Sequence, residues 1–439
     1  MGNSVGIVGG GAAGMMAAIT AARRGAKVTL IEGNDRLGKK ILATGNGKCN
    51  LGNEKLGMEA YYTKEPELLK SCLNRFGTAQ TIAFFQELGV MVKSKNGYLY
   101  PFGGQASIVL DALRFAVREL GVDVVTDCKI GRIDRIDRIE KKRYSGQVYL
   151  QGSGKEFCFD GVILACGSQA APKTGSDGSG YRLAGQLGHG IIPVVPGLVA
   201  LKCREDYFRS VAGVRAEAIL SVYWRGECVA QEQGELQLTE YGISGIPVFQ
   251  ISRIVNYLLK EEAGLAGGKQ SGLGQGRGNL LTKGIEVELN LLPDSVLGNL
   301  EKIREGRNPE QGQKTVEEFF TGILHKKLML LFIKLAGLKP SEPVSAADRE
   351  KIEQVYRLCS HWKVHVIGSG SYENAQVCAG GVPLGEVTED LESKKVSGIY
   401  FAGELLDVDG KCGGYNLQWA WCSGYLAGNA AALRKGKRF

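Results

Sequence analysis

The sequence predicts an α/β fold, in which a parallel sheet with helices on its faces is interrupted by an inserted domain that is part β and part helical. Three observations support this prediction. A buried-strand pattern, a glycine-rich turn and a helix follow one another within the first 25 residues, the composition changes near residue 193, and buried-strand patterns return near residue 364. Parallel strands are buried on both faces, so they appear in a sequence as short apolar runs.

The chain begins with a strand, a helix and a second strand. Residues 5–8 form an apolar run typical of a buried parallel strand. Residues 12–24 follow as a helix of small side chains, and Gly25 marks its end. Residues 28–31 are the second buried strand, which ends at Glu32. This order predicts a βαβ unit with its helix across one face of the sheet.

The turn between the first strand and the helix carries the pattern G-x-G-x-x-G as Gly9, Gly11 and Gly14. Gly9 permits the tight turn, Gly11 leaves room for a pyrophosphate beside the backbone, and Gly14 lets the helix pack closely on the strand. The free N–H groups at the helix start face the phosphates, and Glu32 is placed to accept a hydrogen bond from a ribose 2′-hydroxyl. In this context the pattern predicts a Rossmann-like dinucleotide site. The alternative is an ordinary βαβ unit with a glycine-rich helix start.

A second glycine-punctuated loop covers residues 41–50. Gly45 and Gly47 flank Asn46, which indicates a backbone that closely approaches a ligand. Three ammonium groups available to a phosphate or an electron-rich ring are those of Lys39, Lys40 and Lys48. The alternative is a surface loop, and Cys49 is predicted to be packed rather than reactive.

The remaining elements of the first domain follow from apolar periodicity. Helices are predicted at residues 67–88 (one or two segments), 105–120 and 181–187. Strands are predicted at residues 122–125, 130–136, 148–150 and 157–165, with the last running into Ala165-Cys166-Gly167. Residues 98–104 are predicted to be an aromatic turn or loop, and the glycine-rich residues 173–180 give another helix start suited to an anion.

A different pattern begins near residue 193 and predicts the inserted domain. Its strands are expected at residues 198–203, 218–224, 235–239 and 287–291, and its helices at 248–260, 295–304, 316–322, 326–335 and 346–358. Residues 263–279 have the Gly, Gln and Ser content of a flexible loop. Strands at 364–367, 375–383 and 398–404 and a closing helix at 418–433 predict a return to the first domain. The expected division is 1–192 for the first part of the nucleotide domain, 193–247 for an inserted β-rich part, 248–340 for an inserted helical part, 341–363 for a return segment and 364–439 for the second part of the nucleotide domain.

The composition of the chain narrows the partners and the location that we expect for the protein. The net charge of +8 is modest for 439 residues, and the one basic cluster, at residues 434–438, is expected to be a solvated end, so no nucleic-acid partner is expected. The eleven cysteines lack a C-x-x-C pair, which predicts a reducing compartment and neither a disulfide framework nor a metal site. The apolar run at 328–338 is too short to span a membrane and the first strand leaves no room for a leader. We therefore expect a cytoplasmic protein without membrane contact.

Several motifs together resemble a known family. Residues 9–14 with Glu32, and residues 44–50, 165–167, 174–181, 398–403, 407–410 and 413–420, occur in the order seen in BaiN-type (YhiN-type) flavoproteins. That family includes NAD(P)/FAD-dependent oxidoreductases and aminoacetone-oxidase-like proteins, and the likeness spans the whole chain. A weaker likeness extends to fumarate-reductase and ketosteroid-dehydrogenase flavoproteins. The resemblance implies FAD in the dinucleotide site and a flavin ring that faces the inserted domain.

The resemblance also implies roles for individual residues. The cofactor contacts it implies are Gly9, Gly11, Ala12, Ala13, Gly14, Glu32, Lys40, Gly45, Asn46, Gly47, Lys48, Cys49, Asn50, Ile130, Ala165, Gly167, Gly403, Glu404, Gly414, Tyr415, Asn416 and Leu417. Among these, Ile130 would read the adenine, Gly403 with Glu404 would meet the ribityl chain, and the helix start at residues 414–417 would face the flavin pyrimidine edge. The chain departs from the family where Thr44, Asn46 and Lys48 replace Ser, Gly and Arg, and where Lys411 and Cys412 replace Pro-Thr.

The resemblance implies an FAD-dependent oxidoreductase that moves hydride through flavin N5 and acts on a small molecule. The leading expectation is reduction of a C=C conjugated to a ketone, as in a 3-oxo steroid or bile-acid-like intermediate, with NAD(P)H as a transient electron donor because no second G-x-G-x-x-G is present. Candidate catalytic donors are Lys48, Tyr241 and Tyr415, whereas His325, His361 and His365 are expected to be structural. The alternatives are a flavin-dependent oxidase of an aminoacetone-like amine, an FAD protein without turnover, and an RNA-modifying FAD enzyme. The oligomeric state stays open.

Overall fold

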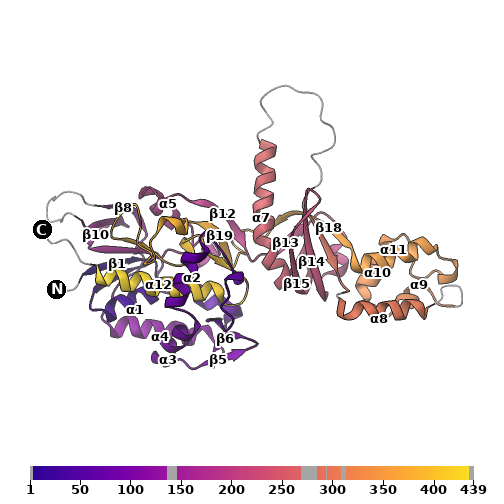
Figure 1. The fold of residues 1–439 in the computed structure, drawn as a ribbon, viewed down its shortest axis with the longest axis horizontal. Coiled ribbons are helices and arrows are strands. Elements are labelled where there is room, and N and C mark those ends of the chain that lie inside the picture. Colours follow the sequence, from indigo (N-terminus) through magenta and orange to yellow (C-terminus); the bar gives the residue numbers. More distant parts are fainter. Residues whose placement is uncertain (1–2, 136–145, 268–283, 293, 308–312, 435–439) are drawn as a thin grey trace, which may run out of the picture. The chain divides into compact units, whose positions relative to one another are not determined.

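The computed structural model describes residues 3–135, 146–267, 284–292, 294–307 and 313–434. The chain folds into two compact units (Figure 1). Unit 1 comprises Met1–Pro196 and Tyr372–Phe439, and unit 2 comprises Gly197–Ser371. Each unit has its own apolar core.

Unit 1 is built on a five-stranded parallel sheet with the order β20-β11-β1-β2-β7. Its strands are β1 (Ser4–Val8), β2 (Lys27–Ile31), β7 (Asp123–Val125), β11 (Gly161–Leu164) and β20 (Ile399–Phe401). The central strands are almost fully buried, as the apolar runs predicted. The Rossmann-like α/β prediction is therefore confirmed for unit 1, and the carboxyl ends of its strands meet along one side, here called the carboxyl edge.

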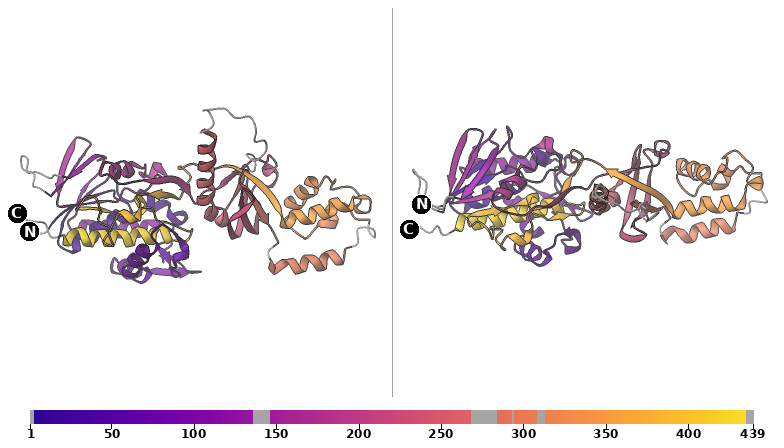
Figure 2. Two further views of the ribbon diagram at one scale, coloured as in Figure 1. Left: turned by 45° about the horizontal axis from the view of Figure 1, so that its top comes forward. Right: turned by 90° about the horizontal axis from the view of Figure 1, so that it is seen from above.

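In the described part of unit 1, six α-helices accompany this sheet. They are α1 (Ala12–Arg23), α2 (Pro66–Arg75), α3 (Thr78–Glu87), α4 (Ala106–Glu119), α5 (Ser179–Gln186) and α12 (Tyr415–Leu433). The last of them, α12, lies beside α1 (Figure 2). A Cβ on Gly424 would lie 3.0 Å from the Cβ of Met16, and one on Gly428 would lie 2.9 Å from the Cα of Ala17. The two helices thus pack backbone against backbone because glycine leaves the space.

Smaller sheets complete unit 1. They are β3 (Gly52–Asn53) with β6 (Tyr98–Pro101) and β5 (Val92–Lys95), β8 (Ile130–Arg135) with β9 (Val148–Gly152) and β10 (Lys155–Phe159), β12 (Ile192–Gly197) with β19 (Val377–Gly381), and β4 (Tyr61–Tyr62) with β21 (Asp409–Gly410). The prediction of a loop at 98–104 is wrong for its first half, because Leu99 is 2% exposed and alternates with two half-buried tyrosines as in a strand. The single strand expected at 157–165 is two strands, since Asp160 leaves the ladder and accepts hydrogen bonds from the N–H and hydroxyl of Ser4, both at 2.8 Å. Residue 136 lies outside the described residues.

Unit 2 contains a closed antiparallel barrel with the order β13-β16-β15-β14-β17-β18, in which β18 pairs back to β13. Its strands are β13 (Leu201–Cys203), β14 (Arg215–Trp224), β15 (Glu227–Thr239), β16 (Gly242–Gly245), β17 (Glu286–Asn290) and β18 (Trp362–Ser369). Its helices are α6 (Phe208–Val211), α7 (Ile246–Gly267), α8 (Asp294–Glu305), α9 (Val316–Phe320), α10 (Lys326–Leu335) and α11 (Arg349–Ser360). The predicted β-rich and helical insertion is thus present as one unit. Most of the loop expected at 263–279 lies outside the described residues.

Trp362 links the barrel to the helices of unit 2. This side chain is 1% exposed, its ring lies 5.2 Å from that of Phe332 on α10, and its indole N–H donates to the Tyr207 hydroxyl at 3.1 Å. A buried indole with a satisfied N–H is a strong anchor between two layers. No helix in the described ranges is both long and apolar enough to cross a bilayer.

The compact units differ from the expected division at two places. Residues 193–196 belong to unit 1, because β12 pairs with β19. Residues 364–371 belong to unit 2, because β18 pairs with β13 and β17 in the barrel. The strand at 364–367, expected to begin the return to the nucleotide domain, is therefore a barrel strand.

Candidate functional site

The carboxyl edge of unit 1 brings together four segments that are distant in sequence. The turn at residues 9–11 follows β1, Glu32 follows β2, residues 165–167 follow β11, and residues 403–404 follow β20. Backbone hydrogen bonds between neighbouring strands hold them there, including one from the N–H of Gly9 to the carbonyl of Ile31 at 2.8 Å. This is the crevice in which open parallel α/β sheets bind their ligands.

The three motif glycines have different reasons to be glycine. Gly9 has a φ of +105°, and its missing Cβ would lie 3.0 Å from the Cα of Cys166. A Cβ on Gly14 would overlap the carbonyl oxygen of Gly9. In contrast, Gly11 has an ordinary φ of −81°, and a Cβ there would meet no atom within 4 Å. The chain itself therefore gives no reason for glycine at position 11, and the open space beside it fits a group the chain does not supply.

The start of α1 is suited to an anion. Its first intrahelical hydrogen bond runs from the N–H of Met15 to the carbonyl of Gly11 at 3.0 Å. The N–H groups of Ala12, Ala13 and Gly14 precede it and have no helical acceptor. The N-cap residue, Gly11, also provides no side-chain cap. The unpaired amides and the positive end of the helix dipole fit a pyrophosphate over Gly11.

Glu32 is a buried carboxylate held by the residues around it. It is 9% exposed; one oxygen accepts a hydrogen bond from the N–H of Gly10 at 2.7 Å, and the other accepts from the N–H and side-chain amide of Asn34 at 2.8 and 2.6 Å. The N–H of Cys128 donates to the Glu32 carbonyl at 2.9 Å, which brings the start of β8 and thus Ile130 toward this carboxylate. Gly10 and Asn34 were not predicted, although Gly10 lies inside the glycine motif.

A second set of polar side chains lies at the carboxyl ends of β11 and β20. One oxygen of Glu404 accepts hydrogen bonds from the ammonium of Lys40 at 2.7 Å and from the hydroxyl of Ser168 at 2.9 Å. The Tyr181 hydroxyl is buried and has no hydrogen-bond partner within the described residues. Burial, with Cys378 and the Glu404 charge adding to it, raises the pKa of Tyr181 well above its usual value. A buried hydroxyl without a partner beside this cluster fits a site that a polar ligand completes.

The loop at 45–50 has a left-handed backbone. Gly45, Asn46 and Gly47 have φ values of 55°, 53° and 79°. Lys48 is exposed, and its ammonium has no ion-pair or hydrogen-bond partner in the described part of the chain. Cys49 is fully buried, and burial raises its pKa to about 12, so it remains a thiol at neutral pH.

The helix start at 414–417 is held by hydrogen bonds to neighbouring loops of unit 1. Gly414 has a φ of 93°, and the first bond of α12 runs from the N–H of Gln418 to its carbonyl at 2.9 Å. The amide of Asn416 donates to the Gly410 carbonyl and accepts from the Gly410 N–H, both at 2.8 Å. The Asn416 side chain thus closes its own loop, whereas the N–H groups of residues 415–417 have no helical acceptor. Asn50, with its amide oriented to satisfy its neighbours, accepts from the Gly414 N–H at 3.2 Å.

The candidate donors are divided between the units. Lys48 and Tyr415 lie in unit 1, whereas Tyr241 lies in unit 2, in the turn after β15, and is 51% exposed. The three histidines discussed above have local partners: His365 pairs with Glu205 at 2.8 Å, His361 with Glu288 at 3.2 Å, and His325 accepts from the N–H of Lys327 at 3.2 Å. These contacts favour structural roles for all three.

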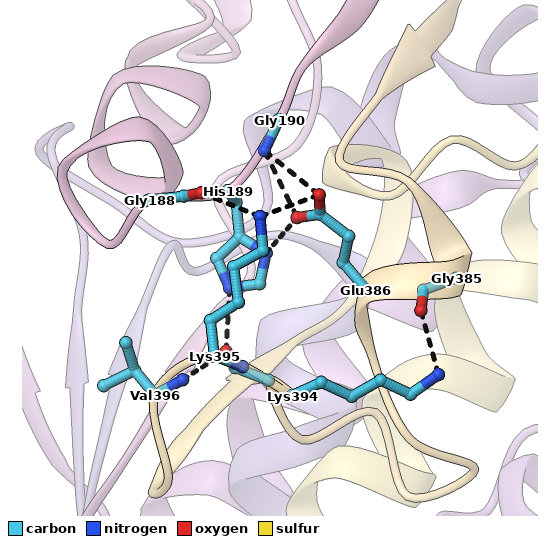
Figure 3. Close-up of polar contacts among 9 residues, drawn as sticks. Gly188, His189, Gly190, Gly385, Glu386, Lys394, Lys395 and Val396 are labelled. Atoms are coloured by element: carbon cyan, nitrogen blue, oxygen red, sulfur yellow. Dashed lines mark hydrogen bonds and ion pairs between the residues drawn. The ribbon is translucent and has the colours of Figure 1, made fainter.

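The fourth histidine, His189, forms a buried cluster in unit 1 (Figure 3). Its Nδ1 lies 2.7 Å from a Glu386 oxygen and its Nε2 lies 2.8 Å from the Ser393 hydroxyl. The order Ser, His, Glu resembles a hydrolytic triad, but Ser393 is 5% exposed and its oxygen accepts from the N–H groups of Lys395 and Val396 at 3.1 and 2.9 Å. The cluster therefore ties the end of α5 to residues 386–396. Burial lowers the pKa of His189, with Glu386 opposing the shift.

Residues 3–430 match the model described as the HI0933-like protein Rossmann domain. A 3-dehydro-bile acid Δ(4,6)-reductase of Clostridium scindens is 41% identical over 98% of this chain and 100% of its own length. A ribosomal RNA dihydrouridine synthase of Haemophilus influenzae is 30% identical over 95% of this chain and 96% of its own. The solved 3-ketosteroid Δ1-dehydrogenase of Sterolibacterium denitrificans aligns with 13% identity and a TM-score of 0.47, over 99% of this chain and 100% of that one.

Proposed function

Because the chain belongs to the HI0933-like family and is an FAD-dependent oxidoreductase, we propose that it reduces a C=C bond conjugated to a carbonyl group, with a 3-oxo steroid or bile-acid-like intermediate as substrate. The resemblance to BaiN-type flavoproteins is thereby confirmed. The observation that carries the proposal is the 41% identity, over 98% of this chain and 100% of the relative, to a reductase of such a bond. The carboxyl edge of unit 1 supports it, since its glycine turn, Glu32 and unpaired amides fit FAD.

The residues of unit 1 would hold FAD at several points. The amides of residues 12–14 would take the pyrophosphate, and Glu32 would accept from the adenosine ribose. The Lys40–Glu404 pair would meet the ribityl chain, and the unpaired amides of residues 415–417 would face the pyrimidine edge. When bound and reduced, FAD supplies hydride from N5. NAD(P)H is proposed as the electron source, docking transiently.

The chain must also stabilise charge on the substrate. Hydride arriving at the β carbon places negative charge on the carbonyl oxygen, which needs a donor, and the α carbon needs a proton. Lys48 is the candidate for the first role, because its exposed ammonium has no partner within the described residues. The Tyr415 hydroxyl is the candidate for the second, since burial raises its pKa and keeps it protonated.

A second candidate substrate is a uracil ring in RNA. The relative at 30% identity is a ribosomal RNA dihydrouridine synthase. Uracil presents the same chemistry as a steroid enone, because its ring C=C is conjugated to a carbonyl. Exposed Lys93 and Lys95 on β5 add positive charge that a phosphate backbone would need.

The test uses the purified protein loaded with FAD. The flavin is reduced under anaerobic conditions by NADH, NADPH or dithionite, and a 3-oxo-Δ4 steroid or a uridine-containing oligonucleotide is then added. In a separate sample, aminoacetone is added to the oxidised protein. We expect the steroid to reoxidise the flavin and to gain two hydrogens, measured by flavin absorbance and product mass. Reoxidation by the oligonucleotide alone would select the second candidate. Reoxidation by neither, together with reduction of oxidised flavin by aminoacetone, would overturn both.

A further inference from the structure

Three tyrosines of unit 1, here called the tyrosine cluster, gather around two of the glycine loops. Tyr98 and Tyr100 lie on one face of β6, because side chains two residues apart in a strand point the same way. A Cβ on Gly413 would lie 2.8 Å from Cε1 of Tyr98 and 3.1 Å from Cε2 of Tyr415, so both rings lie against this glycine. Cε1 of Tyr100 would lie 3.7 Å from a Cβ on Gly45. The cluster thus adjoins the loops at 45–50 and 413–417.

The rings are held in place from behind. Asn53 pairs with Tyr98 across β3 and β6, and its side-chain amide donates to the Gly413 carbonyl at 3.1 Å. The buried Tyr61 packs edge-to-face on Tyr415 with ring centres 5.6 Å apart, and its hydroxyl donates to the Tyr415 carbonyl at 3.0 Å. Contacts of this kind fix ring positions before any ligand arrives.

The hydroxyls of the cluster are free to act. All three rings are half-buried, yet none of the three hydroxyls has a hydrogen-bond partner among the residues that the structure describes. Buried tyrosines usually find a partner for this group. Burial also raises the pKa of Tyr100 and of Tyr415, with Tyr98 adding to both shifts. The hydroxyls of Tyr100 and Tyr415 therefore stay protonated around neutral pH and can donate.

We propose that the tyrosine cluster is the specificity-determining wall of the substrate site and holds a flat ring whose C=C is conjugated to a carbonyl. The ring faces offer stacking surface, and the hydroxyls of Tyr98 and Tyr100 donate to the polar atoms at the edge of the ring. This inference rests on the proposed function and deepens it, because it names residues that select the ring. A steroid A ring and a uracil share this chemistry, so the test has an arm for each.

The test compares Tyr98→Phe and Tyr100→Phe with a matched control, Tyr425→Phe. The control hydroxyl also has no partner in the described part of the chain and lies on the same helix as Tyr415, ten residues or about 15 Å along its axis. The probes are a 3-oxo-Δ4 steroid and a uridine-containing oligonucleotide, each added to the protein with oxidised flavin, which has no hydride to give and so leaves the C=C intact. Their dissociation constants are read from the change in flavin absorbance, and flavin content reports that the site is intact.

We expect each cluster variant to weaken one of the two probes about three- to tenfold, the value of one lost neutral hydrogen bond. Tyr98→Ala should weaken it further through lost stacking, while Tyr425→Phe should match the wild type. The probe whose dissociation constant rises in the cluster variants identifies the ring, steroid or uracil, that the cluster binds.

If Tyr98→Phe, Tyr100→Phe and Tyr98→Ala all bind both probes with the dissociation constants of the wild type, the inference is overturned and the proposed function stands. A wild-type holoenzyme that binds neither probe and reduces neither substrate would overturn the proposed function and the inference with it. Loss of flavin from the cluster variants, with none from the control, would assign the tyrosines to the cofactor instead and overturn the inference.

Discussion

Replacing Gly11 by Ala should remove the cofactor without disturbing the fold. The new Cβ meets no atom of the chain within 4 Å, and φ is an ordinary −81°. The free energy of unfolding should fall by about 0.5–1 kcal/mol, because an N-cap position prefers glycine to alanine. For a chain of 439 residues, whose entropy of unfolding is about 0.9 kcal/mol/K, that lowers Tm by about 1 °C. FAD affinity should fall at least tenfold, about 1.4 kcal/mol, because the methyl occupies the space assigned to the pyrophosphate.

The matched variant is Gly14→Ala, three residues along the same helix. Its Cβ would overlap the carbonyl oxygen of Gly9 and lie 3.0 Å from the carbonyl carbon, and backbone cannot move aside as a side chain does. Overpacking of this kind lowers the free energy of unfolding by about 3 kcal/mol. Alanine gains about 1 kcal/mol over glycine inside a helix. The net loss of about 2 kcal/mol should therefore lower the stability of the apo protein well below that of Gly11→Ala.

Two measurements separate the effects. Calorimetric scans of the apo proteins give the stability change, and titration with FAD, followed by quenching of flavin fluorescence, gives the affinity. If Gly11→Ala binds FAD as tightly as the wild type, the pyrophosphate does not lie over Gly11. If Gly11→Ala destabilises the apo protein as much as Gly14→Ala, the space beside Gly11 is not open.

Three further predictions concern polar groups of unit 1 and a surface thiol. Lys40→Met leaves the half-buried Glu404 carboxylate without its cation and should lower the free energy of unfolding of the apo protein by about 1–3 kcal/mol, measured in urea. Adding Glu404→Gln should recover most of this free energy. No recovery in the double variant would contradict the pairing. Burial holds the pKa of His189 below its ordinary 6.5, so the unfolded chain takes up the proton first, and stability should fall as pH drops below 6.5 toward the folded pKa. The Tm of His189→Gln should fall less between pH 7.5 and 5.5, and equal slopes would refute this. Cys49, whose pKa burial raises to about 12, should resist iodoacetamide at pH 8 while exposed Cys228 reacts, as peptide masses will show.

The parts of the fold that follow a local rule could be predicted from the sequence. The strand, turn and helix around Gly9 and Gly14 follow from steric needs that only glycine meets, and the structure shows those needs as overlaps with neighbouring backbone. The buried strands before Glu32 and before Gly403 follow from apolar runs, and the order of the runs places both at the carboxyl edge. The cofactor follows from the family match over residues 3–430.

The parts that depend on distant partners could not be predicted. Residues 98–101 form a short run that ends in a proline and is soon followed by two glycines, so the local pattern does not separate a strand from a turn. The run is a strand because it pairs with β3 and β5 on either side. The apolar run within β18 does not reveal whether it joins the sheet of unit 1 or the barrel of unit 2, since both accept such a strand. Tyr181 gave no signal beyond a glycine-rich loop, because the isolation of its hydroxyl arises from residues far away in sequence.

The packing of α12 against α1 sets an order for co-translational folding. A ribosome must add about 420 residues between Gly14 and Leu433, which takes about 20–80 s at ordinary rates of synthesis. During that time α1 lacks the glycine-faced helix that covers it, and the sheet lacks β20. All the strands of the unit 2 barrel leave the ribosome earlier. Unit 1, whose first strand is made before the barrel, is therefore completed after the barrel, when α12 has emerged.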